Sequence, residues 1–171
     1  MRIPKECRLE KVADKGESRY AFNSLRLERD ENGVTAVASD GRILAAISLD
    51  SEGWESQDAD VLIPVDAWKA SKGGELTVNG KAESRGKSGM TIHDLRDGKY
   101  PDWRQVIPSE AGVKVRLNSK LLRNLLEGLG SDHVVLTVID PGYPVVVRGM
   151  EEGETGPPSD ERLGLIMPIL Q

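Results

Sequence analysis

The sequence predicts an α+β fold in which antiparallel sheets of short strands carry few helices. Two observations lead to this prediction. Short runs of alternating apolar and polar residues recur along the chain, and dipeptides typical of hairpin turns, such as Asn32-Gly33 and Asn79-Gly80, separate them. A strand–helix–strand–strand–strand order is also expected twice, over residues 61–108 and 113–170, after a partial copy without a helix.

The composition limits the class of protein. The chain has 171 residues, of which 38% are hydrophobic and 30% charged, as is typical of a soluble globular protein. Neither a membrane-length apolar run nor a signal-peptide-like stretch in Met1–Lys11 is visible, so we expect a cytoplasmic protein without a membrane partner. A net charge of -5 argues against non-specific nucleic-acid binding, although it leaves room for a basic stripe on an acidic body. Cys7 is the single cysteine and is expected to be a small apolar filler.

The first part of the chain is expected to form a β-meander. Its strands are the alternating segment around Leu25–Glu28, then Val34–Ala38, then Ile43–Leu49. The turns between them are expected at Asp30–Gly33 and Ser39–Gly41, where Asn, Asp and Gly supply the backbone conformations that turns require.

The next part is expected to contain the first complete repeat. A short strand over residues 61–64 precedes a helix over about 66–72, which Asp66 caps and Gly73-Gly74 ends. Strands from residue 76 to about residue 95 follow.

The second repeat begins with an expected strand at Val113–Leu117, after which Asn118 or Ser119 caps a helix that Gly128 and Gly130 end. Five leucines fill one arc of this helix, and Lys120, Arg123, Asn124 and Glu127 fill the opposite arc. Strands are expected at 134–139, 145–147 and 163–169, with an acidic mobile loop over 151–161.

Several segments resemble those of bacterial DNA sliding clamps, the beta subunit of DNA polymerase III. Ala38-Ser39-Asp40-Gly41-Arg42-Ile43-Leu44-Ala45 is similar to a signature of the clamp's middle domain, and Asp97–Pro108, which contains Tyr-Pro-Asp-Trp-Arg, is similar to the run that closes that domain. The ending Leu165-Ile166-Met167-Pro168-Ile169 and the segment Leu117–Leu122 are similar to parts of the last domain. The segments appear in family order, and the resemblance covers about residues 20–170.

The resemblance implies a truncated or divergent member of the family with the DNA-clamp fold. Residues 1–108 resemble a middle domain that lacks its first helix, and residues 109–171 resemble only the second half of a last domain. The chain is less than half as long as a clamp subunit, which has three domains. The usual ring of two such subunits therefore cannot be assembled from this chain in the same way.

The resemblance also implies a peptide-binding pocket between the two regions, with an apolar floor and a polar rim. Ile43 and Gln105 stand where the family has arginine, which removes charge from the rim. The residues that map to the pocket are Ser39, Gly41, Arg42, Ile43, Leu44, Pro101, Gln105, Val106, Asn118, Leu121, Leu165, Met167, Pro168 and Ile169. The alternative is that these segments are plain turns and a strand end.

The second activity that the resemblance implies is encirclement of DNA by a homo-oligomer, with helix cations facing the phosphates. The candidates are Lys69 and Lys72 on the short helix and Lys120 and Arg123 on the longer one, although Glu127 weakens the positive field there. A solvated helix face explains the same residues equally well.

Nothing in the sequence indicates catalysis. His93 and His133 lack partners for a metal or a nucleophile, and no phosphate-binding glycine loop is present, so we expect a non-enzyme without cofactor or metal. One interpretation is a reduced clamp, a processivity factor for DNA replication that surrounds DNA and holds polymerase or repair proteins through short linear peptides. Another is a non-encircling adaptor or competitor for such peptides. The third is a β-rich structural protein whose similarity is accidental.

Overall fold

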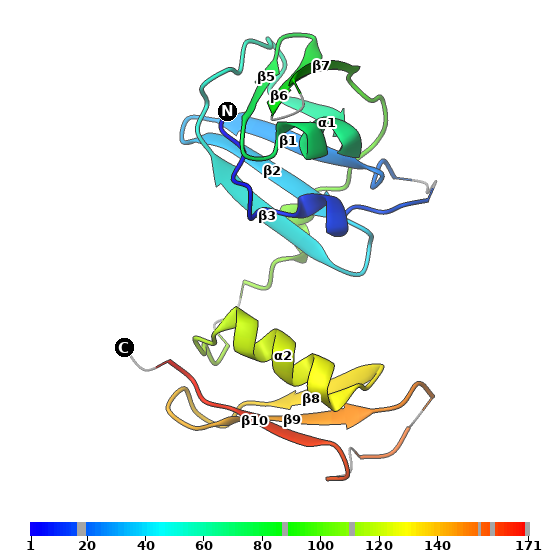
Figure 1. Cartoon of the computed structure of the whole chain (residues 1–171), viewed down its shortest axis with the longest axis vertical. Helices are drawn as coiled ribbons and strands as arrows, with labels where there is room; N and C mark the ends of the chain where they lie inside the picture. Colours follow the sequence, from blue (N-terminus) through cyan, green and yellow to red (C-terminus); the bar gives the residue numbers. More distant parts are fainter. Residues whose placement is uncertain (17–19, 87–88, 110–111, 154, 158–159, 170–171) are drawn as a thin grey trace. The chain divides into compact units, whose positions relative to one another are not determined.

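The protein divides into two compact units, which are described separately (Figure 1). The computed structural model describes residues 1–16, 20–86, 89–109, 112–153, 155–157 and 160–169. Unit 1 comprises Met1–Val106 and unit 2 comprises Ile107–Gln171.

The first sheet of unit 1 is the expected meander with one more strand added. Strands β1 (Ser24–Asp30), β2 (Gly33–Ser39), β3 (Leu44–Leu49) and β4 (Asp60–Pro64) are antiparallel in the order β3-β2-β1-β4. Gly33 has a φ of 137°, and a Cβ there would lie 2.6 Å from the backbone oxygen of Leu49. The β1–β2 hairpin therefore needs glycine at this position.

The second half of unit 1 follows the expected order of one helix and three strands. Helix α1 (Val65–Ser71) leads to β5 (Glu75–Val78), β6 (Lys81–Gly86) and β7 (Gly89–Asp94), which form a sheet in the order β5-β6-β7. The expected capping by Asp66 is wrong: Pro64 occupies the N-cap and no side chain caps the helix. Because β4 runs directly into the helix, Asp66 lies in the first turn and pairs with Lys69 instead.

The core of unit 1 is built around α1, whose Ala67 and Trp68 are fully buried. Apolar residues of β1, β2, β5 and β6 belong to the same cluster, and Cys7 packs against it, as expected of a filler. The hydroxyls of Ser71 and Ser84 both donate to the Ala67 carbonyl oxygen at 2.8 Å. These bonds satisfy the two buried serine hydroxyls, whereas the buried Trp68 Nε1 has no hydrogen-bond partner among the described residues.

The N-terminal residues contribute to unit 1 in a way that the sequence did not indicate. Residues 1–3 lie along the outer edge of β5, where Leu76 N donates to Met1 O at 2.9 Å and Ile3 N donates to Gly74 O at 3.0 Å. The chain then forms a single 3-10 turn, η1 (Leu9–Lys11), whose Leu9 is buried in the core. No longer helix is present in the described part of this half, in agreement with the expected copy without a helix.

Unit 2 consists of one helix on a three-stranded sheet (Figure 1). Helix α2 (Ser119–Leu129) precedes β8 (His133–Thr137), β9 (Val145–Met150) and β10 (Leu163–Ile166), and the sheet has the order β10-β9-β8. The expected N-cap is confirmed, because Asn118 Oδ1 accepts hydrogen bonds from Lys120 N and Leu121 N. Gly130 ends the helix in a left-handed conformation, whereas Gly128 lies inside it.

Two strand predictions for unit 2 need correction. Val113–Leu117 alternates as a strand but forms none, because no described strand of unit 2 pairs with it along its length. The last strand ends at Ile166, and in the described residues after it Ile169 N donates to Arg116 O at 2.8 Å. Residues 154 and 158–159 of the expected mobile loop lie outside the described residues.

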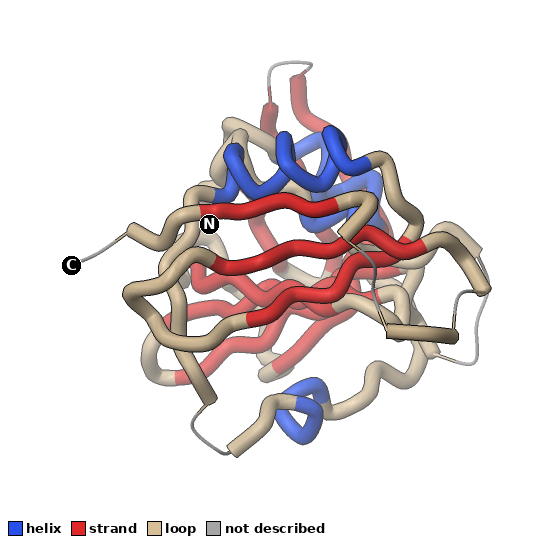
Figure 2. The backbone as a smooth tube through the Cα atoms, turned by 90° about the horizontal axis from the view of Figure 1, so that it is seen from below, coloured by secondary structure: helices blue, strands red, loops and turns tan. Residues whose placement is uncertain are grey.

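Strands make up most of the regular structure, and helices are few (Figure 2). The expected α+β class with antiparallel sheets is therefore confirmed. Within the part of the chain that the structure describes, no helix has the length and apolar character needed to cross a membrane.

Candidate peptide-binding pocket

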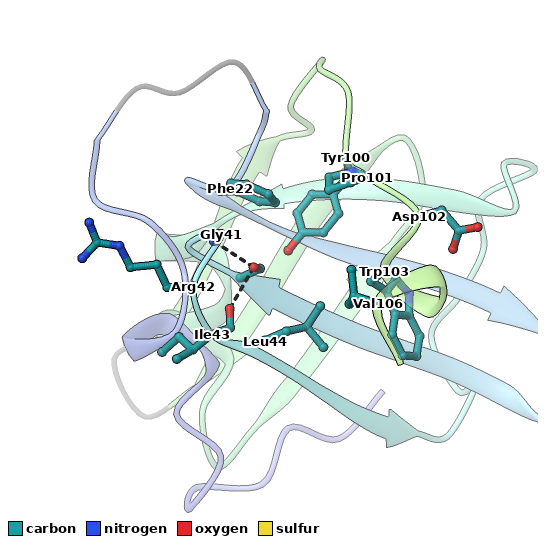
Figure 3. Close-up of a pocket in the computed structure, with 11 residues that line it drawn as sticks. Phe22, Gly41, Arg42, Ile43, Leu44, Tyr100, Pro101, Asp102, Trp103 and Val106 are labelled. Atoms are coloured by element: carbon teal, nitrogen blue, oxygen red, sulfur yellow. Dashed lines mark hydrogen bonds between the residues drawn. The ribbon is translucent and has the colours of Figure 1, made fainter. Parts of the chain in front are cut away.

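The first wall of the candidate site is the tight turn between β2 and β3. Asp40 Oδ1 accepts hydrogen bonds from the backbone N–H groups of Arg42 and Ile43, both at 2.8 Å. The Ser39 hydroxyl donates to Ile43 O at 2.8 Å and accepts from Gly41 N at 3.0 Å (Figure 3). The N–H of Ile43, and then that of Arg42, lower the pKa of Asp40. The turn is thus held by its own side chains.

The opposite wall is the segment that ends unit 1, including the 3-10 turn η2 (Trp103–Val106). Glu28 of β1 holds this turn, because its carboxylate accepts a hydrogen bond from Trp103 Nε1 at 3.2 Å and pairs with Arg104. The Arg104 guanidinium also lies 4.4 Å from the centre of the Trp103 ring. Val106, at the end of the turn, is left 70% exposed.

A cavity of about 250 Å³ lies between these two walls. The Tyr100 ring meets Phe22 edge to face, with ring centroids 5.5 Å apart, and Leu44 and Val106 add aliphatic surface (Figure 3). Arg42 points away from the other side chains (Figure 3). The lining residues are Phe22, Ser39, Gly41, Arg42, Ile43, Leu44, Tyr100, Pro101, Asp102, Trp103 and Val106.

The chemistry of the pocket suits apolar anchors better than charged ones. Tyr100 is 9% exposed, and burial raises its pKa to about 12, with the charge of Arg26 and the Ser39 backbone N–H acting in the other direction. Its ring is therefore a neutral phenol at physiological pH. The volume lies below the ~300–1,000 Å³ of drug-sized sites, so the pocket suits one or two apolar side chains.

The structure brings together the expected pocket residues that unit 1 contributes, with one exception. Ser39, Gly41, Arg42, Ile43, Leu44, Pro101 and Val106 line the cavity, but Gln105 does not. Its side-chain amide donates to Asp102 Oδ2 at 3.1 Å instead. Sequence reasoning missed Phe22, Tyr100, Asp102 and Trp103. The last three lie inside the quoted Asp97–Pro108 segment, so the aromatic residues there were an available signal.

The remaining expected pocket residues lie in unit 2 and are described within that unit alone. Leu121, Leu165, Met167 and Ile169 are exposed by 58%, 59%, 64% and 47%, which leaves them accessible to a ligand. Asn118 is engaged as the N-cap of α2, and Pro168 is buried. Their assignment to the peptide site stays a prediction.

The four cations expected to face DNA are placed on or beside the two helices, and three of them are in ion pairs. Lys69 pairs with Asp66 at 3.1 Å, and Arg123 lies 3.9 Å from Glu127. Lys72 lies just beyond the end of α1, so it does not share a helical face with Lys69, and it pairs with Glu10. Lys120 has no ion pair among the described residues.

The remaining sequence expectations concern a metal site and the histidines. No group of three or more His, Cys, Asp or Glu side chains there could hold a metal ion. His93 Nε2 lies 3.1 Å from Thr91 Oγ1 on an exposed strand, in keeping with an ordinary strand residue.

The fold of the chain matches that of DNA sliding-clamp domains. Among solved structures, the sliding clamp of Bacillus subtilis superposes with a TM-score of 0.69 at 16% sequence identity. The match covers 92% of this chain and 44% of the Bacillus subtilis chain. The DNA polymerase III beta subunit of Pseudomonas aeruginosa covers 93% of this chain and 47% of its own, with a TM-score of 0.65 at 20% identity. At these identities the likeness establishes the fold. No family model matches the chain.

The chain is a distant homologue of the bacterial beta sliding clamp and corresponds to part of it. It is 29% identical over 119 residues to the beta sliding clamp of Chlamydia pneumoniae, which covers 65% of this chain and 32% of the relative. It is 27% identical over 139 residues to the beta sliding clamp of Chlamydia muridarum, and this match covers 74% of the chain and 38% of the relative. The chain thus spans about a third of the length of the curated relatives. The sliding-clamp family is non-enzymatic, in agreement with the expected non-enzyme.

Proposed function

We propose that this protein is a reduced sliding clamp that holds replication or repair proteins through short linear peptides and oligomerises around DNA as a processivity factor. The observation that carries the proposal is the unit 1 pocket, because the two segments most similar to clamp signatures form its two walls. In this proposal residues 1–108 act as the middle-domain-like part and residues 109–171 as the half-domain.

The mode of peptide binding follows from the lining. Leu44, Val106 and the Tyr100 ring offer an apolar floor to an aliphatic or aromatic anchor. The two charged residues of the lining have opposite signs: Arg42 is directed outward, and the Asp102 carboxylate accepts a hydrogen bond from Gln105 Nε2. A peptide that relies on apolar anchors and a glutamine therefore fits this rim better than a strongly acidic one.

The test is a titration of the full chain with a fluorescent peptide that carries a glutamine and two apolar anchors, read by anisotropy. Val106→Asp places a charge in the pocket at an exposed position where folding does not depend on it. Loss of one apolar anchor costs about 1–3 kcal/mol, so affinity should fall about 5-fold or more. The matched control is Ile107→Asp, one residue further on, 54% exposed and outside the lining.

The same titration covers the unit 2 part of the site. Met167→Ala should weaken peptide binding if Met167 takes part in the site, and an unchanged affinity would restrict the site to unit 1. An unmodified chain that binds no such peptide, or equal losses in Val106→Asp and Ile107→Asp, would contradict the proposed pocket.

A second candidate function, a non-encircling adaptor, is favoured by the charges. Lys69, Lys72 and Arg123 are each next to a carboxylate, and the net charge is -5, so the helices offer little free positive charge to phosphates. The discriminating measurement is retention on nicked circular DNA. Retention that disappears when the circle is cut supports encirclement, whereas peptide binding without retention supports the adaptor.

A further inference from the structure

The segment that precedes each helix is paired differently in the two units. In unit 1 this segment is β4, which has neighbours on both edges: β1 on one, with Leu62 opposite Arg26, and Arg96 on the other, where Arg96 N donates to Leu62 O at 2.8 Å. In unit 2 the corresponding segment is Val113–Leu117. Among the described residues, Val113–Leu117 has only a contact of the second kind, the bond from Ile169 N to Arg116 O at 2.8 Å.

The outer sheet edges of the two units also differ: the edge of β5 is paired and the edge of β8 is not paired by any described segment of unit 2. The outer edge of β5 in unit 1 is covered by residues 1–3. The corresponding edge of unit 2 is β8, the last strand of the order β10-β9-β8, and no described segment of unit 2 bonds to it. Unpaired strand edges attract further strands, because their N–H and C=O groups lack partners.

The side chains near this edge are also incompletely covered. Val134 and Leu136 of β8 pair with Gly149 and Val147 and thus share the face on which α2 packs, yet they are 36% and 51% exposed. Helix α2 itself has no buried residue, whereas α1 buries Ala67 and Trp68 completely. Unit 2 is therefore open on its helix side along β8.

We propose that a second copy of this chain completes unit 2 by reciprocal strand exchange. Val113–Leu117 of each copy adds antiparallel to β8 of the other, as β4 adds to β1 within unit 1. The donor strand and the acceptor edge belong to the same unit, so two copies related by a two-fold axis use both and leave neither free.

The charges and the apolar pattern of Val113–Leu117 favour a second copy of this segment as the strand that pairs with β8. The donor strand carries Lys114 and Arg116, and two acidic residues, Asp132 and Asp140, flank β8. Val115 and Leu117 already pack against the unit 2 core. Antiparallel partners share a face, so Val115 comes to lie opposite Leu136, Leu117 opposite Val134, and Arg116 opposite Val135.

This inference rests on the oligomerising part of the proposed function and is independent of the peptide pocket. Analytical ultracentrifugation of the full chain should give twice the chain mass of 18.7 kDa. Leu136→Lys should shift the mass to the monomer, because the charge enters the exchanged interface. The control Ile139→Lys, at a position 71% exposed and beyond the end of β8, should remain a dimer.

A cross-link keeps the test independent of how these variants fold. Arg116→Cys and Val135→Cys are combined in a Cys7→Ser background, where opposite strand positions lie within disulfide range. Oxidation should give a covalent dimer on a non-reducing gel, and each single variant should give far less. A monomeric full chain at high concentration, or an oxidised double variant that stays monomeric, overturns the proposal. A dimer that fails to bind peptide would instead count against the pocket alone.

Discussion

Glu28 provides a direct test of how the pocket wall is held. Its side chain is 13% exposed, and it accepts a hydrogen bond from Trp103 Nε1 and pairs with Arg104 and Arg26. Glu28→Ala removes all three interactions. The turn η2, which carries Val106, then loses its ties to β1.

The magnitude follows from the exposure of each partner. The Trp103 bond to a largely buried carboxylate contributes about 1.5 kcal/mol. Arg104 is 51% exposed, so solvent screening limits its pair to about 0.5 kcal/mol. Arg26 keeps a second partner, Asp60, at 2.9 Å. We therefore expect the free energy of unfolding of unit 1 to fall by about 2 kcal/mol and peptide affinity to fall several-fold.

The assay is urea unfolding followed by tryptophan fluorescence, because all three tryptophans lie in unit 1. Glu28→Gln keeps an acceptor for Trp103 and should recover about half of the loss. Glu31→Ala, at an exposed position in the β1–β2 turn, is the matched control and should change stability little. A loss below about 0.5 kcal/mol for Glu28→Ala, or an equal loss in the control, would refute the reasoning.

Four further predictions concern stability. Burial raises the pKa of Tyr100 to about 12, so the unfolded chain loses this proton at a lower pH than the folded chain does. The free energy of unfolding should therefore fall between about pH 10 and pH 12, by at most ~3 kcal/mol. In alkaline denaturation of Tyr100→Phe this part of the loss should be absent. Asn118→Ala removes the α2 cap and should cost about 1 kcal/mol, measured by circular dichroism. A Cβ at Gly74 would lie 2.0 Å from Arg85 O, so Gly74→Ala should destabilise unit 1 by about 3 kcal/mol, whereas Gly128→Ala, with open space inside α2, should stabilise unit 2 by about 0.5–1 kcal/mol in thermal unfolding.

Local signals predicted the elements of unit 1 well. The Asn-Gly turns at residues 32–33 and 79–80 and the alternation around them define hairpins through short-range chemistry alone. The N-cap at Asn118 is also a local property and was predictable. The N-cap prediction at Asp66 was wrong because the sequence does not reveal that β4 continues into α1 without a loop.

What could not be predicted depends on partners distant in the chain. Val113–Leu117 has the pattern of a strand, but a strand exists only when another edge accepts it. Residues 1–3 pair with β5 although three residues are too few for a period to show. In the pocket, Phe22 meets Tyr100 only through the fold, and no spacing in the sequence indicates that contact.

The small core of unit 2 links its folding to the amount of protein present. Among its described residues the buried apolar cluster of that core consists of Val145, Val147 and Ile166, with other apolar side chains only partly buried, which is little apolar area for an independent unit. If a second copy completes unit 2, then unit 2 folds only as two copies associate. Dilution of the protein therefore shifts unit 2 toward its unfolded form, while unit 1 stays folded. The abundance of the chain would then set how much of it carries a folded unit 2.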